Sequence, residues 1–501
     1  MKTIKYFHLF LILILSFVAT SQFDGYALYN KQNNNNAYLI DKDGIIAHSW
    51  SCNSQCNYTV LLKDNGNIIR GAVNNGNQIN GAAVGGKVQE IDPTGSVVWE
   101  YTYSSADHCS HHDITIIGDN VLLTAWEVKS AAELTQAGYD GANSEKWPTH
   151  FVEIAQNGTG GQIVWEWHIW DHLIQDHNSA KDNYGVVANH PELIDVNMIQ
   201  SSGGGPGGGG PGGGNGDWFH VNGIDYNPAL DQIAFSSRHA SEIYIIDHSS
   251  SITQAATHSG GNSGMGGDIL YRWGNPSNYG ASGSQIIPAA VHDVRWIKDG
   301  APNAGWLQVF NNAGSSGHST VDAIETPING FNYNISTGQA FTPSSYSWRH
   351  DCLDDADGQS ASDRMTNGNV FVNLSEEYMY EVDASGNLVW QYNGGGPAKA
   401  FRYECAHPGI IALLGNPCGL DITTNEHFNY LIYPNPSKGT ITIEGLTNDN
   451  FSISILDAFG KLIKDNITTK YIDINKLTNG IYFLRVTQNN QTTIQKLSLL
   501  K

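Results

Sequence analysis

Short runs of alternating apolar and polar residues, separated by glycine turns, recur along the chain up to about residue 415. The clearest copy is "MTNGNVFVNLSEEYMYEVDASGNLVWQY", residues 365–392. An Asn-Gly turn precedes an apolar strand, "YMYEVD" forms the second strand, and "LVWQY" follows a further glycine turn. Asn-Gly and Asp-Gly between alternating runs are typical of β-hairpins. The pattern therefore predicts antiparallel strands in repeated units.

Five other segments carry the same elements: 37–50, 62–103, 116–170, 227–273 and a divergent copy beginning "IKDGAPNAGWLQVFNN". Repeats of this length, with three or four strands each, are typical of propeller blades. We therefore expect an all-β fold with a six-bladed β-propeller over residues 22–420. The first unit lacks an early strand. Either "FRYEC" or "GIIALLG" (Gly409–Gly415) is expected to pair with it and close the ring.

Two insertions interrupt the repeats. Residues 171–197 lack strand alternation and are expected to form helical turns. Residues 198–216 are rich in Gly, Pro and Ser and bury too little apolar surface to fold. We interpret this tract as a mobile loop.

The pattern of apolar and polar residues changes near residue 430. "YPNPSKGTITIEG" and "FSISILDAFGKLI" show strict alternation with short turns. Residues 430–501 are therefore expected to form a small antiparallel β-sandwich. A binding sandwich is one interpretation of this segment.

The N-terminus has the pattern of a secretory signal peptide over residues 1–21. Lys2 and Lys5 precede an apolar run to about Val18, which small and polar residues follow. The alternative, a membrane anchor, needs about 20 apolar residues, and no stable membrane span is expected. The mature chain is thus expected in an oxidising compartment.

The mature chain has six cysteines, an even number that suggests disulfides in an exported protein. Proximity in sequence favours two pairs, Cys52 with Cys56 and Cys405 with Cys418. That choice leaves Cys109 with Cys352. Six cysteines allow about fifteen connectivities, so other pairings stay open.

Charge limits the classes of partner. The formal net charge is −22, with 26 Lys and Arg against 48 Asp and Glu. Such a chain is repelled by nucleic acid and by acidic membrane surfaces, so neither is an expected partner.

Three histidines precede the innermost strands of successive repeats: His112, His220 and His292. Imidazole serves as an acid or base, as a nucleophile or as a metal ligand. The register across repeats favours a functional site at one mouth of the channel. The alternative is that these histidines cap strands and bind the adjacent Asp113 and Asp293. We expect no metal, because strand starts on different blades are too far apart to share one ion.

Arginines are scarce, so those near the histidines are candidates for binding an anion. Arg238 ends a second strand, and Arg364 is placed by the sequence at the start of the fifth repeat. Guanidinium groups bind sulfate, phosphate or carboxylate through charge-assisted hydrogen bonds. Surface ion pairs are the alternative role for both residues.

Several long stretches of residues 25–415 resemble the arylsulfotransferase family of secreted six-bladed propellers. They are "HHDI" (111–114), "WEWHIWDHLIQDHNSAKDNYGVVANHPELIDVN" (165–197), "DWFHVNGIDYN" (217–227), "SSRHASEIYIIDHS" (236–249), "GGDILYRWGNP" (266–276) and "HDVRWI" (292–297). The resemblance implies transfer of a sulfuryl group from a phenolic sulfate donor to a phenol acceptor through a histidine, with no nucleotide donor and no cofactor. Carried over by motif, His220 and His292 are the expected catalytic residues. His112, Asn222, Arg238 and Arg364 are the expected substrate-binding residues.

The chain departs from that family at two places. The family commonly shows "N-N-G-x-G-R" after the fourth inner strand, and here Asn311-Asn312-Ala313-Gly314 leads to His318 without the arginine. Asp363 stands beside Arg364 where the family carries an uncharged residue. An extracellular binding or adhesion propeller without catalysis is therefore the alternative function.

The C-terminal segment resembles the sorting domain of the type IX secretion system. "PNP" (434–436), Gly439, "DAFGK" (457–461) and "LTNGIYFLRV" (477–486) carry the likeness. It implies the type IX machinery as a partner, export through the periplasm and outer membrane, and a secreted or cell-surface location.

Overall fold

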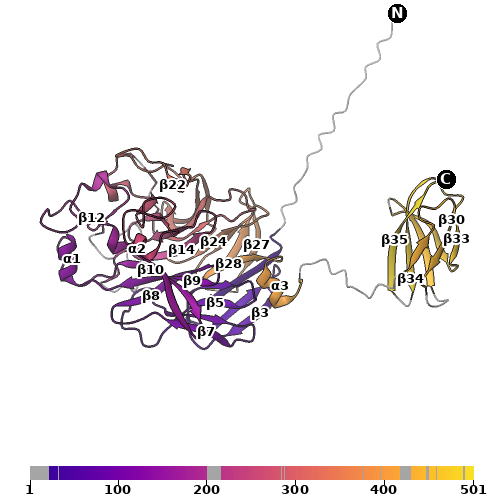
Figure 1. Cartoon of the computed structure of the whole chain (residues 1–501), viewed down its shortest axis with the longest axis horizontal. Coiled ribbons are helices and arrows are strands. Elements are labelled where there is room, and N and C mark those ends of the chain that lie inside the picture. Colours follow the sequence, from indigo (N-terminus) through magenta and orange to yellow (C-terminus); the bar gives the residue numbers. More distant parts are fainter. Residues whose placement is uncertain are drawn as a thin grey trace, which may run out of the picture. The chain divides into compact units, whose positions relative to one another are not determined.

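The computed structural model describes residues 22–31, 33–199, 216–283, 285–286, 288–375, 377–394, 396–417, 430–446, 451–458, 460–488 and 491–501. The chain divides into two compact units, residues 1–417 and 418–501. Both are built from antiparallel strands (Figure 1). No helix among the described residues has the length and apolar character to cross a membrane. The signal peptide and most of the glycine tract lie outside the described residues.

The described part of the first unit contains six four-stranded antiparallel sheets. The strands of each sheet are named below in the order in which neighbours pair. Three sheets come from the N-terminal half. They are β4 (Cys56–Leu62), β5 (Ile68–Val73), β6 (Gly86–Ile91) and β7 (Val97–Thr102); β8 (His108–Ile117), β9 (Asn120–Glu127), β10 (Thr149–Asn157) and β11 (Gly160–His168); and β14 (Val221–Asn227), β15 (Gln232–Ser237), β16 (Glu242–Asp247) and β17 (Ile269–Trp273).

The other three sheets follow, and the last of them joins the two ends of the unit. They are β18 (Val291–Trp296), β19 (Leu307–Ser315), β20 (His318–Ile324) and β23 (Trp348–Asp351); β24 (Ala361–Arg364), β25 (Val370–Asn373), β26 (Met379–Val382) and β27 (Leu388–Tyr392); and β28 (Pro397–Glu404) with β1 (Gly25–Lys31), β2 (Asn36–Ile40) and β3 (Ile46–Ser51).

Strand β28 completes the N-terminal sheet, which is the expected role of "FRYEC". Tyr403 of β28 pairs with Tyr26 of β1, and orange β28 lies among indigo strands in Figure 1. The alternative strand Gly409–Gly415 is wrong, because residues 408–414 form helix α3 (Pro408–Leu414) with proline at its first turn. The sequence prediction also missed β1, whose buried residues lack strict alternation.

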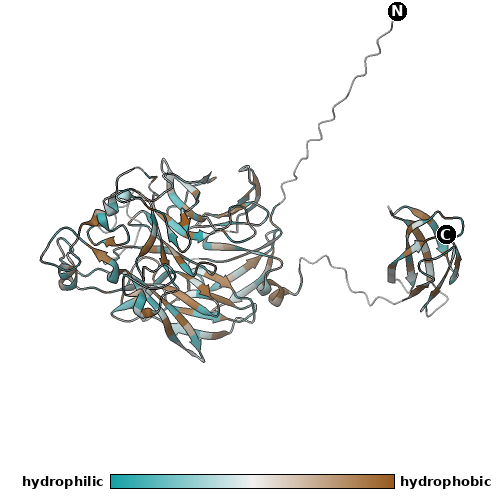
Figure 2. Cartoon of the chain, turned by 45° about the horizontal axis from the view of Figure 1, so that its top comes forward, coloured by the Kyte–Doolittle hydropathy of each residue, from teal (hydrophilic) through white to brown (hydrophobic). Residues whose placement is uncertain are grey.

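The first strands of the six sheets contact one another in cyclic order, β4, β8, β14, β18, β24, β28 and back to β4. Their side chains are almost entirely buried, including polar ones such as Thr59, Asp113 and Lys399. Outer strands such as β7 and β27 expose several side chains and bury only their tryptophans, Trp99 and Trp390. Figure 2 shows hydrophobic and hydrophilic residues interspersed along the strands. The innermost strands thus form a common polar centre, and the apolar cores lie between the sheets.

The insertion at residues 171–197 has short 3-10 turns, as expected. It follows η1 (Ile169–His172) and contains β12 (Leu173–Ile174), η2 (Val187–Asn189) and β13 (Ile194–Asp195). Other short elements of this unit are α1 (Ala131–Ala137), α2 (Ile252–Ala255), η3 (Pro276–Tyr279), β21 (Ile328–Asn329) and β22 (Asn332–Tyr333).

The second unit has two antiparallel sheets with a shared apolar core. The sheets are β29 (Leu431–Tyr433), β30 (Thr440–Glu444) and β33 (Tyr471–Asp473), and β31 (Phe451–Asp457), β32 (Leu462–Ile467), β34 (Gly480–Gln488) and β35 (Gln491–Leu499).

The predicted Cys52–Cys56 disulfide is wrong, because both residues are free thiols. Cys56 Sγ lies 2.8 Å from the Lys31 carbonyl oxygen, and burial raises the pKa of the thiol to about 11. Cys109 and Cys352 are also free, and they pack in different apolar clusters. The pairing of Cys405 with Cys418 stays a prediction, because Cys418 lies outside the described residues.

Candidate active site

The three first strands β8, β14 and β18 each carry an irregularity at or close to their histidine. Pairing with the second strand shifts register between Ser110 and Ile114, between Val221 and Gly223, and between His292 and Arg295. The backbone has positive φ at His112 (46°) and His220 (53°). Bulges re-aim side chains and are common next to functional sites. Here they turn imidazoles out of the regular alternation.

The bulges bring the predicted histidines together in one cluster. The rings of His112 and His220 meet edge to face with centroids 4.6 Å apart, and His239 lies 4.8 Å from His220. The charges of His220 and Arg238 both act on His292. All three predicted histidines and Arg238 therefore share one site.

His220 is paired with a carboxylate that the sequence prediction did not assign. Its Nδ1 lies 2.6 Å from Oδ2 of Asp217, three residues earlier. Trp126 Nε1 donates a hydrogen bond to the other oxygen of Asp217. Asp217 is fully buried, and despite that burial His220 lowers the pKa of its carboxyl to about 2. An ionised Asp217 accepts from the ring and orients it.

One ring nitrogen of His292 forms a hydrogen bond, and the other has no hydrogen-bond partner among the described residues. Its Nδ1 lies 2.8 Å from the carbonyl oxygen of Ala290. A carbonyl oxygen only accepts, so Nδ1 carries the proton and Nε2 carries a lone pair. No described residue binds that Nε2. Burial lowers the pKa of His292 to about 3, so the ring is neutral at pH 7.

Two further histidines border the cluster. His111 stacks on Trp126 with centroids 3.9 Å apart, and its Nδ1 lies 2.7 Å from Nδ1 of His112. His239 binds the Trp218 carbonyl oxygen through Nδ1. Burial lowers the pKa of His111 to about 3 and that of His239 to about 4. In the sequence, His111 is marked only by its place in the doublet "HH", and His239 only by its place next to Arg238.

Asp113 and Asp293 do not bind the histidines that precede them, so the alternative of strand capping by these pairs is wrong. Their carboxylates meet Lys399 from β28, whose Nζ lies 2.8 Å from Asp113 and 3.0 Å from Asp293. Arg295 Nε lies 3.1 Å from Asp293. Lys399 also donates to the Asn222 carbonyl oxygen. These buried charges link four of the first strands at the centre of the unit.

Asn222 uses its side chain to join two sheets. Its Nδ2 donates to the Val291 carbonyl oxygen over 2.7 Å, and its Oδ1 accepts from Ser236. The next residue, Gly223, lies so close to β18 that an added Cβ would stand 2.7 Å from the Asp293 backbone nitrogen. Asn222 and Gly223 therefore hold β14 against β18, the strand that carries His292.

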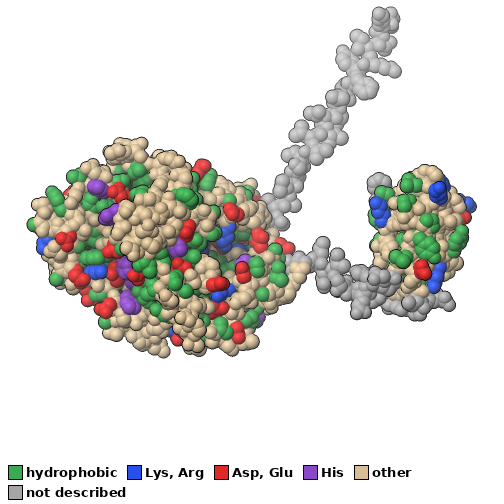
Figure 3. Space-filling model, in the orientation of Figure 1, with side chains coloured by type: hydrophobic (Ala, Val, Ile, Leu, Met, Phe, Trp, Pro, Cys, Tyr) green, Lys and Arg blue, Asp and Glu red, His purple; other side chains and the backbone are tan. Residues whose placement is uncertain are grey.

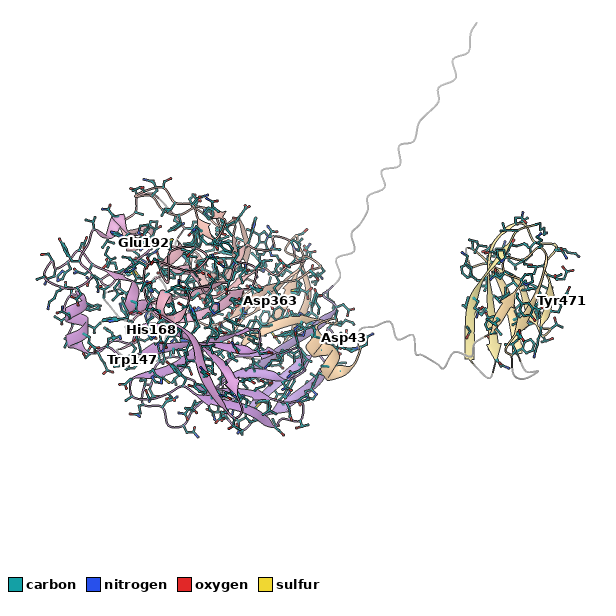
Figure 4. All side chains as sticks on the ribbon, in the orientation of Figure 1. Asp43, Trp147, His168, Glu192, Asp363 and Tyr471 are labelled. Atoms are coloured by element: carbon teal, nitrogen blue, oxygen red, sulfur yellow. The ribbon has the colours of Figure 1, made fainter. Side chains whose placement is uncertain are left out.

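Arg364 lies away from the histidine cluster. It is the last residue of β24, where it stacks over Trp348 and donates to Gln308. Together with Asp363 it lines a cavity of about 400 Å³ at the late ends of β18, β24 and β28. Figure 4 shows Asp363 apart from Trp147, which packs on Trp126 beneath the histidines. The placement of Arg364 at the start of a repeat is wrong, since the first strand begins at Ala361.

His318, near the absent family arginine, is 71% exposed at the side chain and binds Asp355 through Nδ1 over 3.0 Å. It makes no contact with the histidine cluster among the described residues.

The histidine cluster also contains three side chains that together could bind a metal ion. Ligand atoms of Asp217, His220 and His239 lie within 4.8 Å of one another. This possible metal site was not predicted from the sequence, because Asp217 and His239 were not placed beside His220.

Residues 5–338 match the family described as arylsulfotransferase, and residues 431–499 match the family described as a secretion system C-terminal sorting domain. None of the curated proteins matches the chain. Similar solved structures include a Bacteroides caccae protein of unknown function, at 12% identity and TM-score 0.39, covering 76% of this chain and 98% of that one. A Lactobacillus plantarum protein has 12% identity and TM-score 0.34, covering 90% and 100%. The Dos1 propeller has 9% identity and TM-score 0.31, covering 96% of each chain.

Proposed function

Because this chain belongs to the arylsulfotransferase family, we propose that it transfers a sulfuryl group from a phenolic sulfate to a phenol through a histidine. The sorting domain indicates that it acts at the cell surface or after secretion. The observation that carries the proposal is the pair formed by a neutral His292 with an unbound Nε2 and a neighbouring His220 paired with Asp217.

The first half-reaction makes a covalent enzyme. The Nε2 lone pair of His292 attacks sulfur, an N–S bond forms, and the bond between sulfur and the phenolic oxygen breaks. His220, oriented by Asp217, acts as the general acid and gives a proton to the leaving phenolate. The products are N-sulfohistidine and a free phenol.

The second half-reaction returns the enzyme to its starting state. Neutral His220 removes the proton of an acceptor phenol, whose oxygen attacks sulfur. The N–S bond breaks, and its electron pair returns to Nε2 of His292. Asp217 stabilises the positive charge on His220 at this stage. The same imidazole can therefore act as the acid in the first half-reaction and as the base in the second.

Arg238 and His112 supply the remaining interactions. The guanidinium of Arg238 acts on His292, and it is suited to the sulfuryl oxygens as negative charge develops. His112 contacts His220 and forms part of the proposed substrate site. We assign Asn222 a positioning role, since both ends of its amide bind protein groups. No cofactor takes part in this scheme.

We further propose that the six sheets are the blades of a six-bladed propeller. The cyclic contacts of the first strands and the pairing of β28 with β1 support it. In this arrangement the histidines occupy one mouth of the ring. The cavity that contains Arg364 occupies the other, since strands rise about 3.3 Å per residue between them.

The test is release of nitrophenolate from 4-nitrophenyl sulfate, with and without a phenol acceptor. With donor alone, intact-mass measurement is expected to show one added sulfuryl group, absent from His292→Ala. His220→Ala is expected to lower turnover roughly 10²-fold or more. His318→Ala, an exposed histidine outside the cluster, is the matched control and should leave turnover unchanged.

The alternative is a binding propeller without catalysis, which the exposed position of His318 favours, since His318 does not replace the family arginine in the cluster. The position of Asp363 no longer supports it, because Asp363 lies away from the histidines. No nitrophenolate from folded protein would establish the alternative. Unchanged turnover in His292→Ala would instead remove His292 as nucleophile.

A further inference from the structure

A second group of histidines and acids lies outside the proposed catalytic cluster. His172 ends η1, His258 lies in the loop after α2, and Asp268 immediately precedes β17. Nδ1 of His172 lies 2.7 Å from Oδ1 of Asp268, and Nδ1 of His258 lies 2.8 Å from the same oxygen. The ligand atoms of all three residues lie within 4.8 Å of one another. Side chains far apart in sequence thus converge on one point.

The protonation of His172 leaves its lone pair directed at that point. Its Nε2 lies 2.8 Å from the Ala255 carbonyl oxygen, which only accepts a hydrogen bond. Nε2 therefore carries the ring proton, and in the neutral ring Nδ1 is unprotonated. Nδ1 and a carboxylate oxygen at 2.7 Å are then two electron-rich atoms facing each other. Either a second proton between these atoms or a metal ion bound to both from one side satisfies them.

The surroundings of His172 are those of a supported metal ligand. Metal-binding imidazoles usually donate their other ring N–H to a carbonyl or carboxylate, which fixes tautomer and orientation. The Trp167 ring stacks on His172 with an interplanar angle of 6°, and its Nε1 donates to the Gly267 carbonyl oxygen beside Asp268. A Cβ on Gly267 would stand 2.6 Å from His172 Nε2. The His172 ring is therefore held rigidly.

The third residue has the freedom to adjust around an ion. The side chain of His258 is 62% exposed, and Asp268 is its only hydrogen-bond partner among the described residues. Metal–nitrogen bonds of about 2.0–2.1 Å in a tetrahedral site separate the ligand atoms by ~3.3 Å. Small outward movements of the Asp268 carboxylate from His172 and of His258 from Asp268 reach that spacing. The exposed side leaves a fourth position for water.

From these contacts we propose that His172, His258 and Asp268 bind one divalent transition-metal ion of the zinc class. Two imidazoles and one carboxylate suit Zn²⁺, whereas Ca²⁺ and Mg²⁺ prefer all-oxygen sites. The ion would tie the insertion that follows η1 to the loop between α2 and β17. This site is separate from the proposed sulfuryl transfer and does not depend on it.

The test is zinc binding by the mature full-length protein after removal of metal with a chelator. Calorimetric titration with zinc chloride is expected to show an equivalent that is lost in His258→Ala and in Asp268→Asn. His177→Ala is the matched control, because His177 is similarly exposed and binds only Asp140, at 3.5 Å. That variant should keep the equivalent. His220→Ala should keep it too, which separates this site from the donor set in the catalytic cluster.

A second measurement does not depend on calorimetry. Zinc at a large excess over Kd should raise the Tm of the wild type and of His177→Ala, and leave that of His258→Ala unchanged. Zinc binding by His258→Ala equal to that of the wild type would overturn the assignment. So would the absence of any binding by the wild type. His258 is exposed, so its replacement should not impair folding.

Discussion

Oδ2 of Asp217 lies 2.6 Å from Nδ1 of His220, and both groups are buried against Trp126. The two residues stand three apart in "DWFH", where the chain leaves the glycine tract and enters β14. This spacing lets one short segment supply both the imidazole and the group that orients it.

We expect Asp217→Asn to lower the rate of nitrophenolate release roughly 10²-fold, because the amide does not stabilise an imidazolium at His220. The alkaline limb of the pH–rate profile should also shift, because it reports loss of the proton that the general acid donates, and simple loss of packing would not cause that shift. Asp355→Asn, which removes the partner of exposed His318, is the control. An unaltered profile in Asp217→Asn would show that His220 does not carry the proton.

The buried ion cluster should matter for stability. Lys399→Met leaves Asp113 and Asp293 without their shared ammonium and should lower the free energy of unfolding by about 3–5 kcal/mol. Urea denaturation measures the change. Lys42→Met, at an exposed pair with Asp43, should have no measurable effect. Equal stability of the two variants would contradict a structural role for Lys399.

Gly223 is expected to tolerate no side chain. A Cβ there would stand 2.7 Å from backbone atoms of Asp293, so Gly223→Ala should push β14 from β18 and displace His292. Both turnover and Tm should fall. Gly160→Ala is a fair comparison, since its nearest neighbour would lie 3.7 Å away. A fully active Gly223→Ala variant would show that the separation of these strands does not position His292.

The neutral histidines predict loss of stability in acid. Burial lowers the pKa of His292 to about 3, whereas the unfolded side chain titrates near 6.5. The unfolded state therefore binds more protons between those values, so stability is complete above about pH 6.5 and falls as pH decreases toward 3. Each such histidine contributes on the order of 1–2 kcal/mol of this loss at about pH 5.

Comparing urea denaturation at pH 7 and pH 5 measures that loss. It should be smaller in His292→Gln than in the wild type. His190→Gln, at an exposed histidine, should lose as much stability as the wild type. The same loss in His292→Gln and wild type would contradict a neutral buried ring.

Figure 3 shows that acidic side chains outnumber basic ones on the visible face of the first unit, in line with the net charge of −22. Two basic groups near the centre of the unit are removed from this surface: Arg238 is partly buried, and Lys399 is 1% exposed. Surface charge alone therefore gives no indication of where an anionic substrate binds.

The sequence by itself determined the strands and the histidines. Alternation and Asn-Gly turns depend on neighbouring residues only, so the repeats, the sheet-forming C-terminal segment and the shared position of His112, His220 and His292 were all readable from the chain. Motifs of contiguous residues likewise identified the family. These features need no knowledge of which strands meet.

Only the tertiary structure decided which groups face one another. Lys399 reaches Asp113 across 286 residues, and no local pattern marks such a partner. Arg364 lies at the late end of its strand because β24 begins at Ala361, a boundary that turn signals do not locate. Cys52 and Cys56 are close in sequence but remain free thiols, with Cys56 held at the Lys31 carbonyl oxygen. Spacing along a chain limits how far apart two residues lie, whereas bulges, buried charges and strand ends decide where their side chains point.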